Sequence, residues 1–161
     1  MTASVHLWRI AAETREHQAH DISGRGAAKY PGRWNAAGEH IVYAAETLAL
    51  AVLETAAHLN DEGFPLKRFV IQITVPLSIW ETRQERGPSD MDPAWCSIPS
   101  GQVSTSTGSA WYKSTASAIL LVPSVIVPEE SVVLIHATHP DTKYITARTI
   151  RPFEFNKLFR R

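Results

Sequence analysis

Helical periodicity is confined to one convincing segment of this chain, and that scarcity limits the folds it can adopt. Residues 47–59 form an apolar, alanine-rich run, with Thr47 as a predicted N-cap and Asn60 just after its end. About six other segments have the alternation or the β-branched content of strands. They are residues 5–11, 40–45, 67–76, 118–122, 131–137 and a part of 143–155. The helices are too few for regular βαβ alternation, so the pattern predicts an α+β fold: a single mixed domain with central strands and few helices.

The other stretches are predicted to be irregular. Residues 12–38 are polar, contain several glycines and Pro31, and are interpreted as a long ordered loop. Loops of that length inside a compact domain are usually functional or mobile. Residues 81–101 hold several turn formers, and we expect one helical turn near Trp95. Residues 104–114 are ambiguous, although their Ser/Thr start and aromatic centre allow a short helix.

Composition limits the class of protein. The 161 residues fit one domain, residues 1–161, with enough chain for a sizeable core. Sixteen basic and sixteen acidic side chains cancel, which argues against direct binding of a nucleic acid. The single cysteine, Cys96, fits a reducing compartment. The chain has no signal-like start and no apolar run long enough for a bilayer, so we expect a cytoplasmic protein without membrane contact.

Glu54 is the only charged side chain between Glu46 and Asp61. A carboxylate in an apolar helix loses water and needs a cation, a hydrogen-bond donor or a function. On a helical wheel Glu54 shares the least bulky face with Ala51, Thr55 and His58, and that face suits either a cleft or solvent. The bulkier side chains crowd the other face: Leu48, Val52, Leu53, Ala56 and Leu59.

Two further candidates precede Glu54 in the chain. Tyr43 lies in a predicted strand, and Arg33 lies in the segment Gly32-Arg33-Trp34-Asn35 of the long loop. Arginine offers a planar fork that matches a phosphate, and glycine permits close backbone approach. An arginine, a phenol and a half-buried carboxylate can form a site for a cationic, phosphate-bearing substrate. The plainer alternatives are that Arg33 pins its loop to a nearby acid and that Tyr43 packs in the core.

Three other side chains are weaker candidates. Arg9 lies between Trp8 and Ile10 in a predicted strand, so it projects opposite them, into a site or into solvent. Trp34 is by residue type more often a packing residue than part of a ligand cage. Ser124 follows a proline at the end of a predicted strand, where it also suits a simple turn.

Metal binding is not indicated by the sequence. His136 and His139 are three residues apart and Asp141 is near, but no histidine–carboxylate helix motif or CxxC pair is present. Phosphate-loop, dinucleotide and nucleophile-elbow fingerprints are also missing from the sequence. We therefore predict a site that works without metal.

Six ordered segments together resemble the RES domain family, and the resemblance extends over nearly the whole chain. They are Trp8-Arg9-Ile10, Ser23-Gly24-Arg25-Gly26-Ala27, Gly32-Arg33-Trp34-Asn35, Val42-Tyr43, Ala51-Val52-Leu53-Glu54 and Leu121-Val122-Pro123-Ser124. The family takes its name from an arginine, a glutamate and a serine, which match Arg33, Glu54 and Ser124. The chain departs from the family at residues 135–140, where members often have an Asn-Pro pair before a histidine.

The resemblance implies the fold of ADP-ribosyltransferase toxins and NAD+ as the substrate. RES proteins are known as toxins of bacterial type II toxin–antitoxin systems, each neutralised by a partner with an Xre-like helix-turn-helix region, which we expect to block the active site. The implied enzyme cleaves the nicotinamide–ribose bond and passes ADP-ribose to a protein, to water or to phosphate. By the same resemblance the catalytic residues are Glu54, Tyr43 and Arg33, and the NAD+-binding residues are Arg9, Arg33, Trp34, Tyr43 and Ser124.

These residues have distinct expected roles. Glu54 would stabilise the positive charge that develops on the ribose and orient the incoming nucleophile. Arg33, with Arg9 as a second contact, would clamp the pyrophosphate. Tyr43 would stack on the nicotinamide or ribose, and Ser124 would hydrogen-bond Glu54 or a ribose hydroxyl.

Two other classes of function stay open at this point. One is a non-catalytic module that only binds a nucleotide, and the other is a nuclease toxin. The zero net charge and the missing metal cluster speak against the nuclease. The sequence does not fix the acceptor of ADP-ribose, any target protein, the oligomeric state or the antitoxin contacts.

Overall fold

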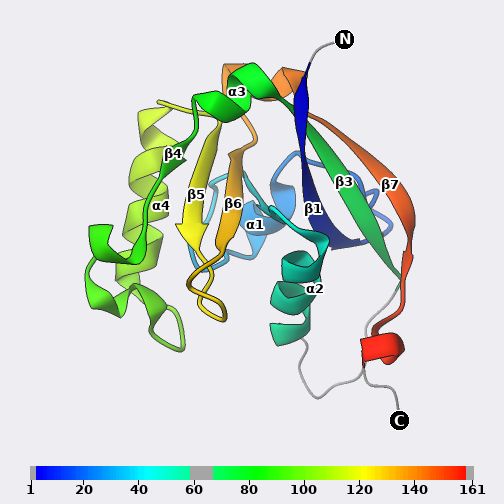
Figure 1. Cartoon of the computed structure of the whole chain (residues 1–161), viewed down its shortest axis with the longest axis horizontal. Helices are drawn as coiled ribbons and strands as arrows, with labels where there is room; N and C mark the ends of the chain where they lie inside the picture. The colour runs from blue at the N-terminus through cyan, green and yellow to red at the C-terminus, as the bar shows by residue number, and fades with distance from the viewer. Residues whose placement is uncertain (1–2, 59–66, 159–161) are drawn as a thin grey trace.

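The computed structural model describes residues 3–58 and 67–158 of the chain (Figure 1). Within these ranges its strands are Ser4–Ala12 (β1), Ile41–Ala45 (β2), Arg68–Pro76 (β3), Gln84–Glu85 (β4), Ile119–Pro123 (β5), Ser131–His136 (β6) and Thr146–Phe153 (β7). Its α-helices are Arg25–Lys29 (α1), Leu48–Ala57 (α2), Leu77–Glu81 (α3) and Gln102–Ser114 (α4). Short 3₁₀ turns lie at Pro88–Asp90 (η1), Pro93–Cys96 (η2), Pro140–Tyr144 (η3) and Phe155–Leu158 (η4).

The α+β prediction is confirmed, and each of the predicted strands is present within a few residues of its expected bounds. Thr47 caps α2 as predicted, because its side chain accepts a hydrogen bond from the Leu50 backbone N–H at 3.1 Å. The helical turn expected near Trp95 is η2. The predicted end of the helix at Leu59 lies outside the described residues.

The predicted irregular segments contain more structure than the sequence indicates. The 12–38 loop includes α1, residues 77–81 form α3, and β4 lies within the 81–101 segment. Elements of one turn or two residues carry too little periodicity to be recognised, and they depend on tertiary contacts. The ambiguous 104–114 segment is the full helix α4, although serine, threonine and glycine disfavour helices.

The strands form one sheet in the order β4-β5-β6-β2-β1-β3-β7, within the described residues. Every neighbouring pair is antiparallel except β4 and β5, which are parallel. The β1–β2 pairing is limited to Trp8 opposite Ala45, whereas β1 and β3 pair along their whole length. The sheet therefore consists of two well-paired halves, β4-β5-β6-β2 and β1-β3-β7, that meet at one point.

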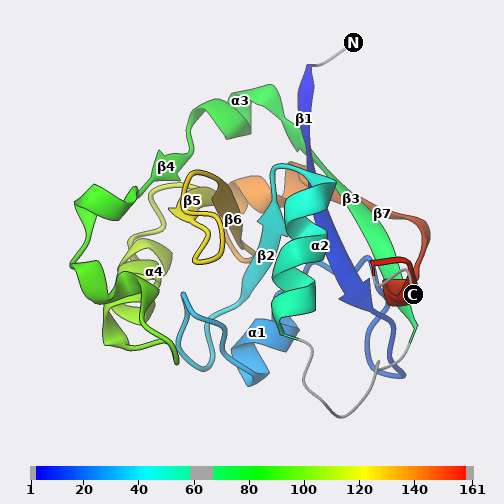
Figure 2. The ribbon, with the colours of Figure 1, turned by 60° about the horizontal axis from the view of Figure 1, so that its bottom comes forward.

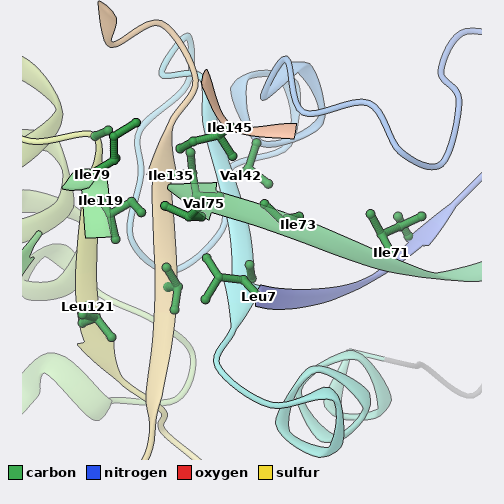
Figure 3. Close-up of a cluster of buried hydrophobic side chains, with 14 of the residues drawn as sticks. Leu7, Val42, Ile71, Ile73, Val75, Ile79, Ile119, Leu121, Ile135 and Ile145 are labelled. Atoms are coloured by element: carbon green, nitrogen blue, oxygen red, sulfur yellow. The ribbon is translucent and has the colours of Figure 1, made fainter. Parts of the chain in front are cut away.

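One apolar cluster joins the two halves, and we call the sheet face that carries it the inner face. It includes Leu7 of β1, Val42 of β2, Ile73 of β3, Ile119 of β5 and Ile135 of β6, each at most 1% exposed. Figure 3 shows these side chains pointing toward one another from both halves. Strand alternation then sends the intervening residues to the opposite, outer face.

Helices α2 and α4 lie on the outer face, over different parts of the sheet. Leu50 and Ala51 of α2 pack with Ile10 and Ala45. Trp111 of α4 packs in another cluster of the outer face. Figure 2 shows α2 crossing β1 and β2, with α4 beside β5 and β6. This arrangement leaves the outer side of β2 between the two helices.

Candidate active site

Glu54 and Ser124 form a hydrogen-bonded pair between α2 and the end of β5. Ser124 Oγ donates to Glu54 Oε1 over 2.6 Å. Ser124 Oγ also accepts the backbone N–H groups of Ile126 and Val127, each at 3.1 Å, and Ser124 is 1% exposed. The hydroxyl is fully used, with one bond donated and two accepted. Among the described residues Glu54 Oε2 has no hydrogen-bond partner, so this oxygen is available to a ligand.

The side of α2 that carries Glu54 faces the sheet. Leu50 and Ala51 are the buried residues of α2, and Glu54 follows them by one helical turn. Leu53, which the helical wheel placed on the bulky face, is 40% exposed. The expectation that the bulky face is the more crowded one is therefore wrong at Leu53. Glu54 itself is half-buried, which favours the cleft interpretation of its face over the solvent one.

Tyr43 projects onto the outer face and holds the loop that contains Arg33. Its hydroxyl accepts the Trp34 backbone N–H at 3.1 Å and donates to Asn35 Oδ1 at 2.6 Å. Gly32 lies against the ring, where a Cβ atom would come within 2.8 Å of Tyr43 Cζ and Oη. Burial raises the pKa of the Tyr43 hydroxyl far above its ordinary value, and nearby Glu39 adds to the effect. The phenol is therefore neutral and its hydroxyl is occupied.

Arg33 is anchored through one end of its guanidinium group. Its Nη1 donates to the carbonyl oxygens of Trp95 at 3.0 Å and Ser97 at 2.9 Å. The expected alternative of a pin to an acid is not seen, since its partners among the described residues are backbone carbonyls. Trp34 stacks on Trp95 with ring centroids 6.2 Å apart, which holds the same segment. In the described part of the chain, Nε and Nη2 of Arg33 have no hydrogen-bond partner and can bind an anion.

The two groups of residues meet on the outer face. Trp34 and Tyr43 belong to an apolar cluster that Val125 also joins. Val125 follows Ser124, which holds Glu54. The structure therefore brings the predicted site residues of α2, β2 and the loop onto one face. Along the sheet, Tyr43 is level with Leu120 of β5, four residues before Ser124.

Arg9 lies on the inner face of the sheet, opposite the other candidate side chains, and contacts the backbone of Tyr43. It projects opposite Trp8 and Ile10, as expected from alternation, and these two pack on the outer face with α2. Its Nη1 donates to the Tyr43 carbonyl at 3.2 Å, beside the single Trp8–Ala45 pair. Burial lowers the pKa of Arg9, and Asp21 partly offsets the effect. Its buried Nε has no hydrogen-bond partner among the described residues.

Two buried polar residues of the site were not predicted. Asn35 is 1% exposed and binds Tyr43, Gly32, Ala27 and Ala36. Glu39 is 7% exposed, and its Oε1 accepts the Ala36 N–H and the Ser109 hydroxyl, each at 2.7 Å. Both residues lie in or beside the long polar loop. The only sequence signal was that Asn35 closes the Gly-Arg-Trp-Asn segment.

Helix α4 is joined closely to this loop. A Cβ atom at Gly108 would lie 1.7 Å from the Trp34 carbonyl oxygen, so only glycine fits there. Thr105 Oγ1 donates to the Arg33 carbonyl at 3.3 Å, and Ser109 binds Glu39. The small polar side chains that weaken α4 as a helix are thus the ones that let it approach the loop.

The histidines considered for metal binding have other roles. His136 is 2% exposed, stacks on Tyr112 with centroids 4.0 Å apart, and its Nε2 donates to the Tyr112 carbonyl at 2.9 Å. His139 Nδ1 accepts the Asp141 backbone N–H at 3.0 Å. Over residues 3–58 and 67–158, no group of three His, Cys, Asp or Glu side chains could hold a metal ion. No described helix is long and apolar enough to cross a bilayer.

Two open cavities lie away from the residues of the candidate site. One, of about 670 Å³, is lined by Glu16, His17, Arg25, Ala28, Lys29 and His40. The other, of about 570 Å³, lies between residues 21–23 and 137–145. Neither is lined by Arg33, Tyr43 or Glu54. The candidate site is therefore defined by its contacts and its free polar atoms.

Comparison with known proteins identifies the family. The RES domain model matches residues 6–156. A Sphingobium sp. (strain YBL2) protein described as "Prs ADP-ribosylating toxin" is 47% identical over 156 residues, which covers 97% of this chain and 96% of the relative. A Yersinia enterocolitica protein described as "Toxin Res" is 32% identical, with coverage of 92% and 94%.

The fold is also found in a solved structure. The chain resembles a chain in the crystal structure of the M. tuberculosis MbcT–MbcA toxin–antitoxin complex, with a TM-score of 0.63 and 16% identity. The likeness covers 94% of this chain and 86% of the other, and at this identity it concerns the fold. From the match over residues 6–156 and the close relatives, the chain belongs to the RES domain family.

Proposed function

We propose that this protein is the toxin of a toxin–antitoxin system and that it consumes NAD+, breaking the nicotinamide–ribose bond and passing ADP-ribose to an acceptor. The observation that carries the proposal is the Glu54 carboxylate, fixed by Ser124 at 2.6 Å with its second oxygen free. It shares the outer face with an arginine whose Nε and Nη2 are unoccupied within the described residues. The relative named as an ADP-ribosylating toxin supports the same reaction class.

Glu54 has the properties that this reaction needs. When the bond between ribose C1′ and the nicotinamide nitrogen breaks, both electrons leave with the neutral nicotinamide, and positive charge develops on the ribose. A carboxylate held beside C1′ stabilises that charge. An acceptor O–H or N–H then attacks C1′, and Glu54 Oε2 accepts its proton. Ser124 keeps the carboxylate in one orientation, so no reorganisation is needed during the step.

The other predicted residues bind the dinucleotide. Arg33 donates to the pyrophosphate through Nε and Nη2, while Nη1 stays anchored to Trp95 and Ser97. Tyr43 contributes its ring, because its hydroxyl is occupied. Trp34 supports both of them. Arg9 is the second proposed pyrophosphate contact, from the inner face, where its Nη1 is bonded to the Tyr43 carbonyl.

The direct test is the release of nicotinamide from NAD+ by the purified protein. Glu54→Gln keeps the shape and the Ser124 bond but removes the charge, so the rate should fall about 100- to 1000-fold. Glu129→Gln is the matched control, since Glu129 is exposed in the β5–β6 turn and should leave the rate unchanged. A Glu54→Gln protein that cleaves NAD+ at the parental rate contradicts the site. Binding of NAD+ without any cleavage would instead favour a nucleotide-binding module.

A second experiment identifies the acceptor of ADP-ribose. Incubation of the protein with labelled NAD+ and cell lysate gives a labelled protein band if the acceptor is a protein. Free ADP-ribose or its phosphate is expected if water or phosphate accepts. We propose a protein acceptor as the first outcome to test, because the relative's description names an ADP-ribosylating toxin.

The proposed toxin needs a partner that restrains it. We propose an antitoxin with an Xre-like helix-turn-helix region that blocks the site, and the complex that contains the structural neighbour supports an antitoxin in general. Expression of the protein alone should stop growth, and Glu54→Gln should not. RNA that is degraded during this arrest would favour the nuclease alternative.

A further inference from the structure

We propose that Asn35 is the positioning residue of this site: it holds the Tyr43 ring and the Arg33 loop together as one rigid unit. The catalytic part of this inference rests on the proposed NAD+ cleavage. The structural part, that Asn35 fixes Tyr43 and its loop, stands on the hydrogen bonds alone.

All the hydrogen-bonding capacity of the Asn35 side chain is used. Oδ1 accepts the Gly32 N–H at 2.9 Å and the Tyr43 hydroxyl at 2.6 Å. Nδ2 donates to the carbonyl oxygens of Ala27 and Ala36, each at 2.9 Å. The two carbonyl partners cannot donate, so the orientation of the amide is fixed by its surroundings. An amide with four partners resists rotation better than one with fewer.

These bonds determine the direction of the Tyr43 hydroxyl. Because its oxygen accepts the Trp34 N–H, its hydrogen is directed to Asn35 Oδ1. Arg33 lies between Gly32, which binds Asn35, and Trp34, which binds Tyr43. The backbone on both sides of Arg33 is therefore tied to the Asn35–Tyr43 pair. This fixes the position of the Arg33 Cα atom, from which the side chain extends.

Asn35 acts through its neighbours. At 1% exposure it cannot touch a ligand on the outer face. Through Ala27 it also ties α1 to the loop. Removal of its amide should let the Tyr43 ring and the Arg33 loop move relative to Glu54, and a shift of about 1 Å can cost about 100-fold in rate.

Amide hydrogen exchange tests the structural part without any activity. In Asn35→Ala the Gly32 amide loses its acceptor and the Trp34 amide loses the alignment of the Tyr43 hydroxyl, so both should exchange at least about tenfold faster. Tyr43→Phe should accelerate the Trp34 amide and leave the Gly32 amide protected. If either variant leaves the Trp34 amide as protected as in the parent protein, the proposal is overturned.

Nicotinamide release tests the catalytic part. Asn35→Ala should lower kcat about 100-fold. Because Asn35 acts through Tyr43, the double variant Asn35→Ala/Tyr43→Phe should lose much less than the product of the two single losses. Losses that simply multiply would overturn the positioning role. Ser117→Ala is the control, since Ser117 is equally buried and bonded to Trp111, and its effect should combine independently with Tyr43→Phe.

Asn35→Asp gives a further signature. The ionised carboxylate would face two carbonyl oxygens, whereas the protonated acid can donate to one of them while its other oxygen accepts. Its activity relative to the parent should therefore rise as the pH falls, and a constant ratio would count against the role. If the parent protein releases no nicotinamide, the proposed function fails, and the exchange result still decides whether Asn35 holds Tyr43.

Discussion

At the scale of single residues, the site is organised by side chains that hold other side chains. Ser124 holds Glu54, and Asn35 and Trp34 hold the Tyr43 hydroxyl. On the outer face, the site groups left free within the described residues are Glu54 Oε2 and two nitrogens of Arg33. The division separates supporting hydroxyls and amides from the groups that we propose to meet the substrate.

Ser124→Ala tests the support of Glu54. It leaves the Ile126 and Val127 N–H groups without their acceptor, so the free energy of unfolding should fall by about 1–3 kcal/mol. Nicotinamide release should also fall, by about tenfold or more, because Glu54 loses its fixed orientation. Urea unfolding and the NAD+ assay measure the two effects. A rate that stays at the parental level in a folded Ser124→Ala protein would remove Ser124 from the site.

Residue type and order marked Arg33, Tyr43 and Glu54 as candidates, but each had a plainer alternative, and their predicted roles came from the resemblance to the RES family. Asn35 and Glu39 were missed for a physical reason. An asparagine or glutamate in a polar loop has the same local pattern whether it is solvated or buried. Its bonds to Ala27 and Tyr43, or to Ser109 far along the chain, exist only after folding.

At the scale of elements, α4 shows how packing overrides local preference. Its serines, threonines and glycine disfavour a helix, but Gly108, Thr105 and Ser109 contact the loop at residues 33–39. Helix α1 is similarly held by the Asn35 bond to Ala27. The sequence did not predict α1 and left α4 ambiguous, whereas α2, with its apolar run and Thr47 cap, was predicted.

Gly108→Ala and Gly26→Ala form a matched pair of helix substitutions. Alanine favours a helix over glycine by about 1 kcal/mol, so Gly26→Ala, with open space around its Cβ, should stabilise the protein slightly. At Gly108 the new Cβ would meet the Trp34 carbonyl, so α4 must move and the protein should lose about 1–3 kcal/mol. Thermal melting checks both signs. Equal melting temperatures for the two variants would contradict the close approach of α4.

At the scale of the whole molecule, the apolar cluster of the inner face joins the two halves of the sheet, which within the described residues are paired with each other at only one position. The halves of the sheet share the Trp8–Ala45 pair at their junction, yet buried residues from β1, β2, β3, β5 and β6 pack in one cluster. The cluster therefore keeps the two halves, and with them the parts of the site, in one position.

His136 should make the free energy of unfolding of the protein depend on pH. Burial lowers its pKa, with His139 adding to the effect and the Tyr112 carbonyl and Glu39 opposing it. The unfolded chain then binds the proton first, so stability is present above about pH 6.5 and is lost as the pH falls toward the lower native pKa. The melting temperature should drop between pH 7.5 and pH 5, and less so in His136→Gln.

The difference between those two proteins is the measurement that isolates His136. Glu46, whose pKa is raised by burial, acts in the opposite direction at the acid end of this range, and it is present in both. Identical pH profiles for the parent and His136→Gln would contradict the assignment.

The position of half-buried Glu54, one turn after the buried residues of α2, has an evolutionary consequence. A glutamine there would keep the Ser124 bond and remove a half-buried charge, and we expect Glu54→Gln to raise the free energy of unfolding by about 1 kcal/mol. Cells that survive expression of the protein without an antitoxin would then be enriched in inactive variants that are more stable than the parent protein. Only continued selection for toxic activity would keep a glutamate at position 54.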